Sequence, residues 1–233
     1  MWLLNSSIGR KLIMSISGVF LILFLVFHMS MNIVAVFSAE AYNLICEFLG
    51  ANWYALVGTA VLAGGFLVHI VYAFMLTLQN QKARGDQRYA VSGRPKGVDF
   101  ASQNMFVLGA IIALGMIMHL AQFWYKMQFA EILGYHYVEL GAGANSIVVS
   151  VVDGATFIQY WFSNPIICIL YLIWFAALWF HLTHGFWSAL QTVGWSNQIW
   201  FNRWKCISNI FATVIFLGFA FVVVVFYLKQ FCA

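Results

Sequence analysis

The sequence has few charged residues and only two prolines among its 233 residues. Charged residues make up 8% of the chain, hydrophobic residues make up 64%, and the mean hydropathy is +0.88. Soluble globular domains carry about 25% charged residues, so this composition excludes an ordinary water-soluble protein. The four cysteines form no CxxC motif and no zinc-binding spacing, which excludes the usual thiol-based metal and redox sites.

Long apolar runs dominate the chain instead. Runs of about 20 apolar residues are typical of transmembrane helices. The sequence has five of them, at residues 12–37, 53–78, 105–129, 165–190 and 207–228. It therefore predicts an all-α membrane protein in which residues 1–233 form a single five-helix transmembrane domain. We expect the longest connection, residues 130–164, to be an interfacial loop.

The basic residues predict the orientation. All the lysines and arginines except Lys126 and Lys229 fall before the first run, between the second and third, or between the fourth and fifth. Cytoplasmic segments carry the excess of Lys and Arg, so these segments are predicted to be cytoplasmic. The N-terminus should then lie inside and the C-terminus outside, with the bundle in contact with membrane lipid.

Histidines occur inside the apolar runs, where an ionisable side chain is costly and usually functional. The 1.5 Å rise per helical residue places His28 about 25 Å from Lys11, in the outer half of the membrane. His119 also falls in the outer half, whereas His69 and the fourth-run histidines fall in the inner half. We expect His136, in the long connection, to be an interfacial or solvated side chain. The histidines of the runs are His28, His69, His119, His181 and His184.

Two facing histidines at one depth are what bis-histidine haem ligation requires, because each imidazole binds the iron from one side of the macrocycle. The sequence therefore predicts two haems, one held by His28 and His119 and one by His69 with a histidine of the fourth run. Small residues one helical turn from a ligand would make room for the macrocycle. They are Gly65, Gly115, Ala177 and Gly185.

Two histidines compete for the fourth ligand position. His181 has Ala177 and Gly185 on its face, whereas His184 has Phe180 and Ser188. We therefore predict that His181 binds the inner haem iron. His184 would contact a propionate, a water molecule or a backbone carbonyl.

Three roles without haem fit the histidines less well. A single intramembrane histidine can form a helix–helix hydrogen bond. This role does not readily explain histidines that occur on four different spans and are paired by depth. Proton relays usually include carboxylates, and none falls within the runs. A non-haem metal would need its ligands at one depth, and these histidines occupy two.

The chain resembles the diheme cytochrome b anchor subunit of succinate dehydrogenases and fumarate reductases. The resemblance covers nearly the whole chain, and its most specific parts are "SGVFLILFLVFHMSMN" with His28 and "FHLTHGFWSALQTVGW" with His181. In that family, the ligand of the fourth span is followed four residues later by glycine, which here selects His181 and Gly185. "AEAYN" after the first run fits the family as well.

The resemblance implies two b haems and a flavoprotein and an iron–sulfur subunit as partners, in a bacterial inner membrane. In the family, electrons pass between the iron–sulfur clusters and a quinone, and diheme members typically use menaquinone. The chain has no dinucleotide-binding fingerprint and no iron–sulfur cysteine array, so those functions would belong to the partners. No nucleic-acid partner is expected.

One position departs from the family pattern. Some members carry a glutamate two residues before the fourth-span ligand, and this chain has Trp179 there. A proton path through the membrane is therefore not predicted. Glu47, beyond His28, is a candidate proton acceptor at a quinone site, with a solvated acid as the alternative.

Two alternative functions remain open from the sequence. One is the cytochrome b subunit of another quinone-linked dehydrogenase, such as a hydrogenase or formate dehydrogenase. The other is a small proton-coupled transporter that uses histidines. Placement of the histidines on four spans and the pattern from Trp179 to Trp195 favour the succinate dehydrogenase type.

Overall fold

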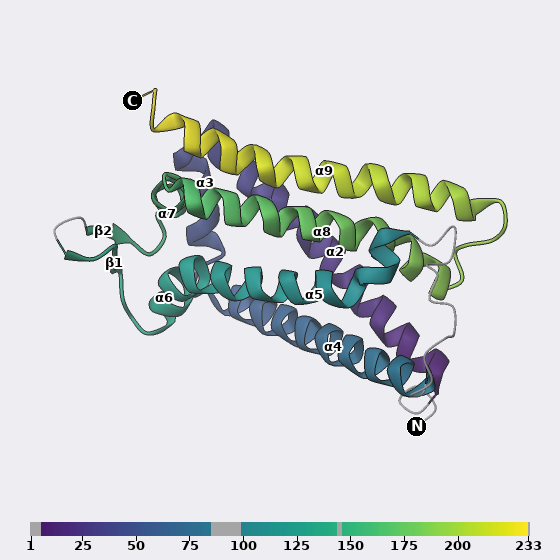
Figure 1. Ribbon diagram of the computed structural model, residues 1–233. Helices are drawn as coiled ribbons and strands as arrows, with labels where there is room; N and C mark the ends of the chain where they lie inside the picture. The colour runs from purple at the N-terminus through teal and green to yellow at the C-terminus, as the bar shows by residue number, and fades with distance from the viewer. Residues whose placement is uncertain (1–5, 85–98, 144–145, 233) are drawn as a thin grey trace.

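A computed structural model describes residues 6–84, 99–143 and 146–232, which form a bundle of long helices with shorter elements at one end (Figure 1). In these ranges five helices are long and apolar enough to cross a membrane. They span Ser7–Phe37, Trp53–Ala83, Phe100–Ile132, Pro165–Thr192 and Trp200–Lys229. The all-α fold with five spans is therefore confirmed. Arg88, Arg94 and Lys96, used above for orientation, lie outside the described residues.

The helices extend beyond the apolar runs because backbone hydrogen bonding continues through the polar residues at their ends. Helix α2 (Ser7–Phe37) begins at the N-cap Ser6, whose side chain accepts a hydrogen bond from the Gly9 N–H. Ser38 ends α2 and caps the next helix, α3 (Ala39–Phe48), by accepting from the Ala41 N–H. Helix α4 (Trp53–Arg84) follows after a short turn.

The third span changes its helical type along its length. Helix α5 (Phe100–His119) continues as the π-helical segment η1 (Leu120–Phe129) and ends in α6 (Ala130–Ile132). The π-helical segment begins directly after His119. Such segments are rare and occur frequently at functional sites.

Residues 130–164 are more ordered than the predicted interfacial loop. They contain strands β1 (Tyr137–Leu140) and β2 (Ile147–Ser150) and helix α7 (Gly154–Phe162). The strands pair antiparallel, with Tyr137 opposite Ser150 and Leu140 opposite Ile147. Together with α3, the hairpin and α7 form a group that we call the end cap. It lies at the end of the bundle that carries the C-terminus, which we call the outer end (Figure 1).

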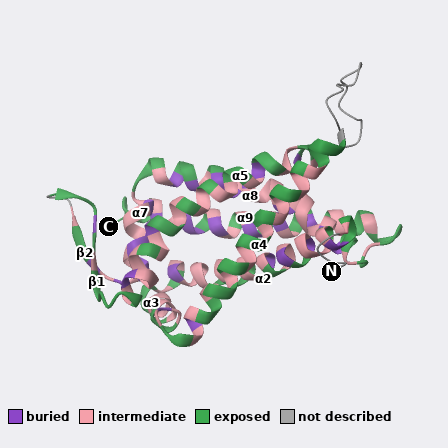
Figure 2. Cartoon of the chain, turned by 90° about the horizontal axis from the view of Figure 1, so that it is seen from below, coloured by how far each residue is buried: buried purple, intermediate pink, exposed green. Residues whose placement is uncertain are grey.

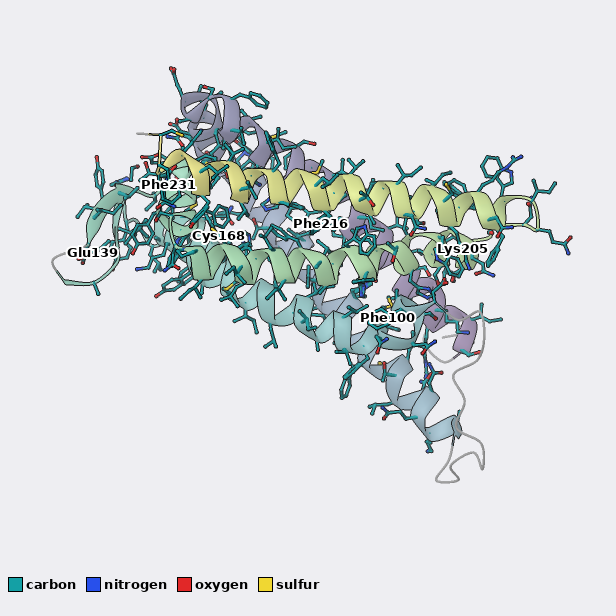
Figure 3. The ribbon with its side chains drawn as sticks, turned by 45° about the horizontal axis from the view of Figure 1, so that its top comes forward. Phe100, Glu139, Cys168, Lys205, Phe216 and Phe231 are labelled. Atoms are coloured by element: carbon teal, nitrogen blue, oxygen red, sulfur yellow. The ribbon has the colours of Figure 1, made fainter. Side chains whose placement is uncertain are left out.

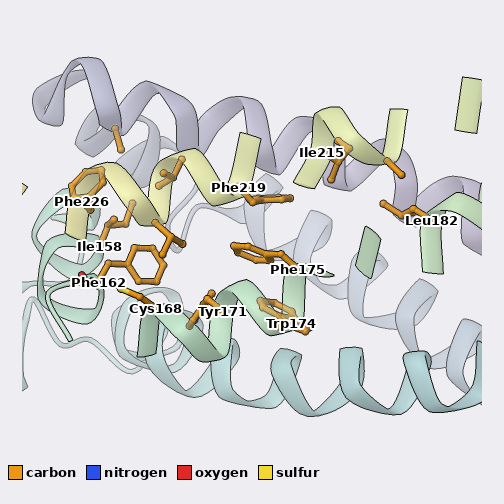
Figure 4. Close-up of a cluster of buried hydrophobic side chains, with 14 of the residues drawn as sticks. Ile158, Phe162, Cys168, Tyr171, Trp174, Phe175, Leu182, Ile215, Phe219 and Phe226 are labelled. Atoms are coloured by element: carbon orange, nitrogen blue, oxygen red, sulfur yellow. Dashed lines mark hydrogen bonds between the residues drawn. The ribbon is translucent and has the colours of Figure 1, made fainter. Parts of the chain in front are cut away.

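Helices α8 (Pro165–Thr192) and α9 (Trp200–Lys229) are the pair of helices with the most extensive mutual packing in the bundle. They pack on each other, and buried side chains of both line their interface, including Phe175 and Phe219 (Figure 4). By contrast, α4 packs chiefly on α2, and the most apolar stretch of α4 contains no buried residue.

Many exposed residues of the long helices are apolar, and Figure 2 shows that exposed positions are spread along these helices. Leu67, Leu114 and Ile210 are each more than 60% exposed. Exposed apolar surface on this scale is expected where a helix contacts lipid. The two ends of the bundle are more polar, with Glu139 near one end and Lys205 near the other (Figure 3).

Candidate functional site: two histidine pairs

The histidines of four different helices meet in two pairs. The ring centroids of His28 on α2 and His119 on α5 are 5.8 Å apart, and the ring planes cross at 83°. The centroids of His69 on α4 and His181 on α8 are 6.3 Å apart, with the planes at 66°. The structure thus places together the histidines that depth had grouped. We call them the outer pair and the inner pair.

The separations suit two imidazoles that share one metal ion. A metal–imidazole bond is about 2 Å long, so rings bound to opposite sides of one ion have centroids about 6 Å apart. Among the described residues, no group of three or more His, Cys, Asp and Glu could hold a metal ion. A haem needs only two axial ligands from the chain, because its macrocycle supplies the other four.

Aromatic side chains surround the outer pair. Phe24 stacks on His28 with centroids 5.3 Å apart, and Phe123 lies 5.1 Å from His119. The indole of Trp174 lies 5.7 Å from His119, and its N–H donates to the Ile112 carbonyl. Trp174 is itself part of the large cluster of buried hydrophobic side chains (Figure 4). The outer pair is therefore set in rigid, well-packed surroundings.

A buried hydrogen-bond network holds His119. The Tyr171 hydroxyl lies 3.3 Å from His119 Nδ1 and donates to Gln122 Oε1 at 2.7 Å. The backbone carbonyl of Gln122, the residue buried within η1, accepts from the Trp161 indole. The ring nitrogens of His28 make longer polar contacts, with Asn32 Nδ2 at 3.4 Å from Nε2 and 3.5 Å from Nδ1.

His69 of the inner pair lies against the backbone of α2. Its Nδ1 is 3.2 Å from the Ser17 hydroxyl, which donates to the Met14 carbonyl at 3.0 Å. A Cβ added to Gly18 would lie 3.3 Å from His69 Cε1, a tight contact, so the ring lies close to the backbone of α2 at this glycine. A Cβ added to Gly109 or to Gly185 would lie 4.0 or 3.9 Å from the His181 ring, an ordinary van der Waals contact.

Two of the four small residues predicted to face a macrocycle contact aromatic side chains instead. The Phe20 ring lies against Gly65, and the Trp174 indole lies against Gly115, where an added Cβ would overlap the rings. Glycine lets the rings reach the helix backbone at both positions. Ala177 is buried in a small cluster with Ala101 and Leu108. Of the three glycines, Gly185 is the one whose added Cβ would meet a predicted ligand ring, that of His181 at 3.9 Å.

His184 lies one turn beyond His181 on α8, toward the end of the bundle opposite the C-terminus, which we call the inner end. Its ring meets Trp187 edge-on at 4.9 Å, and its buried Nδ1 has no hydrogen-bond partner among the described residues. Lys205, which pairs with Asp99 at 3.5 Å, lies over the same indole. His136 is exposed next to β1 and belongs to neither pair.

Glu47 lines a hollow of about 410 Å³ at the outer end. Glu131, which was not predicted from the sequence, lines it as well. Its carboxylate accepts from the Ala51 N–H and lies against Gly50, where any larger side chain would collide with it. The other lining residues are Leu44, Phe48, Asn52 and Tyr54.

Trp179 makes a structural contact at the position where some members of the resembling family carry a glutamate. Its indole N–H donates to the Thr213 hydroxyl on α9 at 3.0 Å. This bond connects α8 to α9.

Ser17 and Tyr171 contact the histidines, and Gln122 accepts the hydrogen bond of Tyr171, but none of the three was predicted from the sequence. A signal for two of them was present, because Ser17 and Gln122 are polar residues inside apolar runs. Polar groups at membrane depth need partners, and a histidine network supplies them.

Comparison of the chain with protein-family models, curated proteins and solved structures finds no match.

Proposed function

We propose that this chain is the membrane anchor of a succinate dehydrogenase or fumarate reductase, with two b haems that connect an iron–sulfur subunit to a membrane quinone. The observation that carries the proposal is the presence of two histidine pairs from four helices, each at a separation suited to one iron. The motifs around His28 and His181 give the resemblance to that family.

In this proposal, the four histidines would hold the two haems, each through one ring nitrogen. His28 and His119 would bind one haem, and His69 and His181 the other. The haems, when bound, would supply one-electron carriers at two depths of the membrane. The chain's own part is to hold four neutral imidazoles in fixed orientations inside an apolar bundle, where water is excluded.

The charge distribution supports an orientation with the inner end in the cytoplasm of a bacterial cell. Arg10 and Lys11 lie at the start of α2, and Arg203 and Lys205 at the start of α9. The iron–sulfur and flavoprotein partners would dock at this end. The N-terminus would be cytoplasmic and the C-terminus outside.

The hollow at the outer end is the candidate quinone site. Glu47 and Glu131 both line it. Carboxylates there would exchange the protons that a quinone takes up and a quinol releases. Menaquinone is the quinone typical of diheme members of the family. The proposed role of Glu47 thus extends to a pair of carboxylates at this end.

The proposal is tested by haem analysis of the chain purified from membranes with its partners. Pyridine haemochromogen analysis should give two b haems per chain, and the reduced-minus-oxidised spectrum should show two components. One haem per chain would contradict the two-pair scheme. No haem would overturn the proposal and favour the transporter. His136→Ala, which alters an exposed histidine, is the control and should keep both haems.

A further inference from the structure

In each pair, a hydroxyl group from a neighbouring helix contacts Nδ1 of one histidine. Tyr171 on α8 contacts His119 at 3.3 Å, and Ser17 on α2 contacts His69 at 3.2 Å. The two hydroxyls come from different helices and belong to different residue types. Each also has a second partner, and that partner fixes the direction of the bond to the histidine.

The proton of the Tyr171 hydroxyl is already committed. It points to Gln122 Oε1 at 2.7 Å, the shorter of the two contacts of the hydroxyl. A hydroxyl has one proton and two lone pairs, so toward His119 the oxygen must accept. The His119 ring therefore carries its proton on Nδ1, and Nε2 keeps a free lone pair.

Ser17 has the same arrangement. Its hydroxyl donates to the Met14 carbonyl of its own helix at 3.0 Å, so it accepts from His69 Nδ1. Gly18, beside it, leaves room for the ring. The backbone of α2 thus determines the tautomer of His69, as Gln122 determines that of His119.

We propose that Tyr171 and Ser17 are positioning residues that hold His119 and His69 in the Nδ1–H tautomer with Nε2 free to bind iron. This inference rests on the proposed function. Metal-binding histidines usually donate their second ring nitrogen to an oxygen, which orients the ring and makes it a stronger electron donor. Each pair would then contain one oriented ligand and one partner ring without such a hydroxyl.

The partner rings differ in this respect. His181 Nδ1 is buried and has no hydrogen-bond partner among the described residues. His28 has only the long contacts with Asn32, whose Nδ2 donates to the His28 carbonyl at 2.7 Å. We therefore expect the electronic effect of the second hydrogen bond to come from His119 in the outer pair and from His69 in the inner pair.

The test is a redox titration of Tyr171→Phe and Ser17→Ala in the purified complex, with the two haem components followed separately. Loss of the accepting oxygen makes the imidazole a weaker donor, which disfavours ferric iron. The midpoint potential should therefore rise. A tenfold weaker preference for the ferric state corresponds to a rise of about 59 mV for a one-electron couple. Tyr171→Phe should raise only the outer component and Ser17→Ala only the inner one.

Matched variants separate positioning from packing. Ser30→Ala removes a hydroxyl that bonds only its own helix in α2, and Tyr227→Phe removes a tyrosine hydroxyl near the end of α9. Both controls should leave the two potentials unchanged. Ser17→Thr keeps the hydroxyl and should preserve the inner potential.

The outcomes are distinct. Absence of haem from the unchanged chain would overturn the proposed function. Two haems whose potentials do not respond to Tyr171→Phe or Ser17→Ala would overturn the positioning inference alone. Loss of only the outer haem in Tyr171→Phe would support the inference, because lost second hydrogen bonds typically weaken metal binding about 10- to 100-fold. Equal shifts or joint loss of both components would overturn it.

Discussion

The outer pair lies among aromatic rings, whereas the inner pair lies among glycines. His119 is enclosed by Phe123, Trp174 and the hydrogen-bonded Tyr171. His69 instead lies directly on the backbone of α2 at Gly18, and His181 lies near Gly185. The two regions reach similar ring separations by different means. The outer one relies on interlocked side chains, and the inner one on close approach of helix backbones.

This difference matters for how each region responds to change. Rigid aromatic packing cannot absorb an added atom, because protein interiors are close-packed. The inner region borders α4, which packs chiefly on α2 and has little buried surface. We therefore expect an added methyl group near the outer pair to destabilise the packing around both of its histidines. Near the inner pair, neighbouring side chains should move to accommodate it.

The largest expected effect is a difference in haem content between variants of the two histidines of α8. His181→Ala should remove the inner haem and leave the outer one, because His181 faces His69 at 6.3 Å. His184→Ala should keep both haems, because its ring faces Trp187 instead. Haem content per chain and the reduced-minus-oxidised spectrum measure both. Retention of both haems in His181→Ala together with loss in His184→Ala would reverse the assignment.

A smaller effect is expected from filling the glycine contacts. Gly115→Ala would drive a methyl group into the Trp174 indole, which is buried and bonded to Ile112. Overpacking of this kind costs about 1–3 kcal/mol. Gly65→Ala meets the partly exposed Phe20 ring, which can move aside. Thermal unfolding in detergent should show a clear loss for Gly115→Ala and a smaller one for Gly65→Ala. A larger loss at Gly65 would contradict the contrast between the regions.

The five spans could be predicted from the sequence because apolar runs of about 20 residues seldom occur outside transmembrane helices. The pairing of His28 with His119 could also be predicted, since depth follows from the helical rise alone. The hairpin and α7 could not, because β1 and β2 are short and pair only in the context of the end cap. Tyr171 was missed for a related reason. Its contact with His119 depends on how α8 packs against α5, and a sequence carries no direct record of rotation between helices.

The smallest effect is expected from thiol labelling of the two ends. Burial raises the pKa of the Cys46 thiol in α3 to about 11. The reactive thiolate is then scarce below that pH and increases only as the pH approaches it. At about pH 8, the thiolate fraction should be roughly 200-fold below that of an ordinary cysteine. Exposed Cys206 at the inner end should alkylate readily. Mass spectrometry of iodoacetamide-treated protein measures both, and rapid labelling of Cys46 would contradict a closely packed outer end.

The most direct test of the two-pair account is the haem content of double histidine variants. His28→Ala/His119→Ala changes both members of the outer pair and should leave one haem per chain. His28→Ala/His69→Ala changes one member of each pair and should leave none. Western blotting of the membranes confirms that both variants insert. One haem in the first variant and none in the second would match the account, whereas one haem in the second would contradict it.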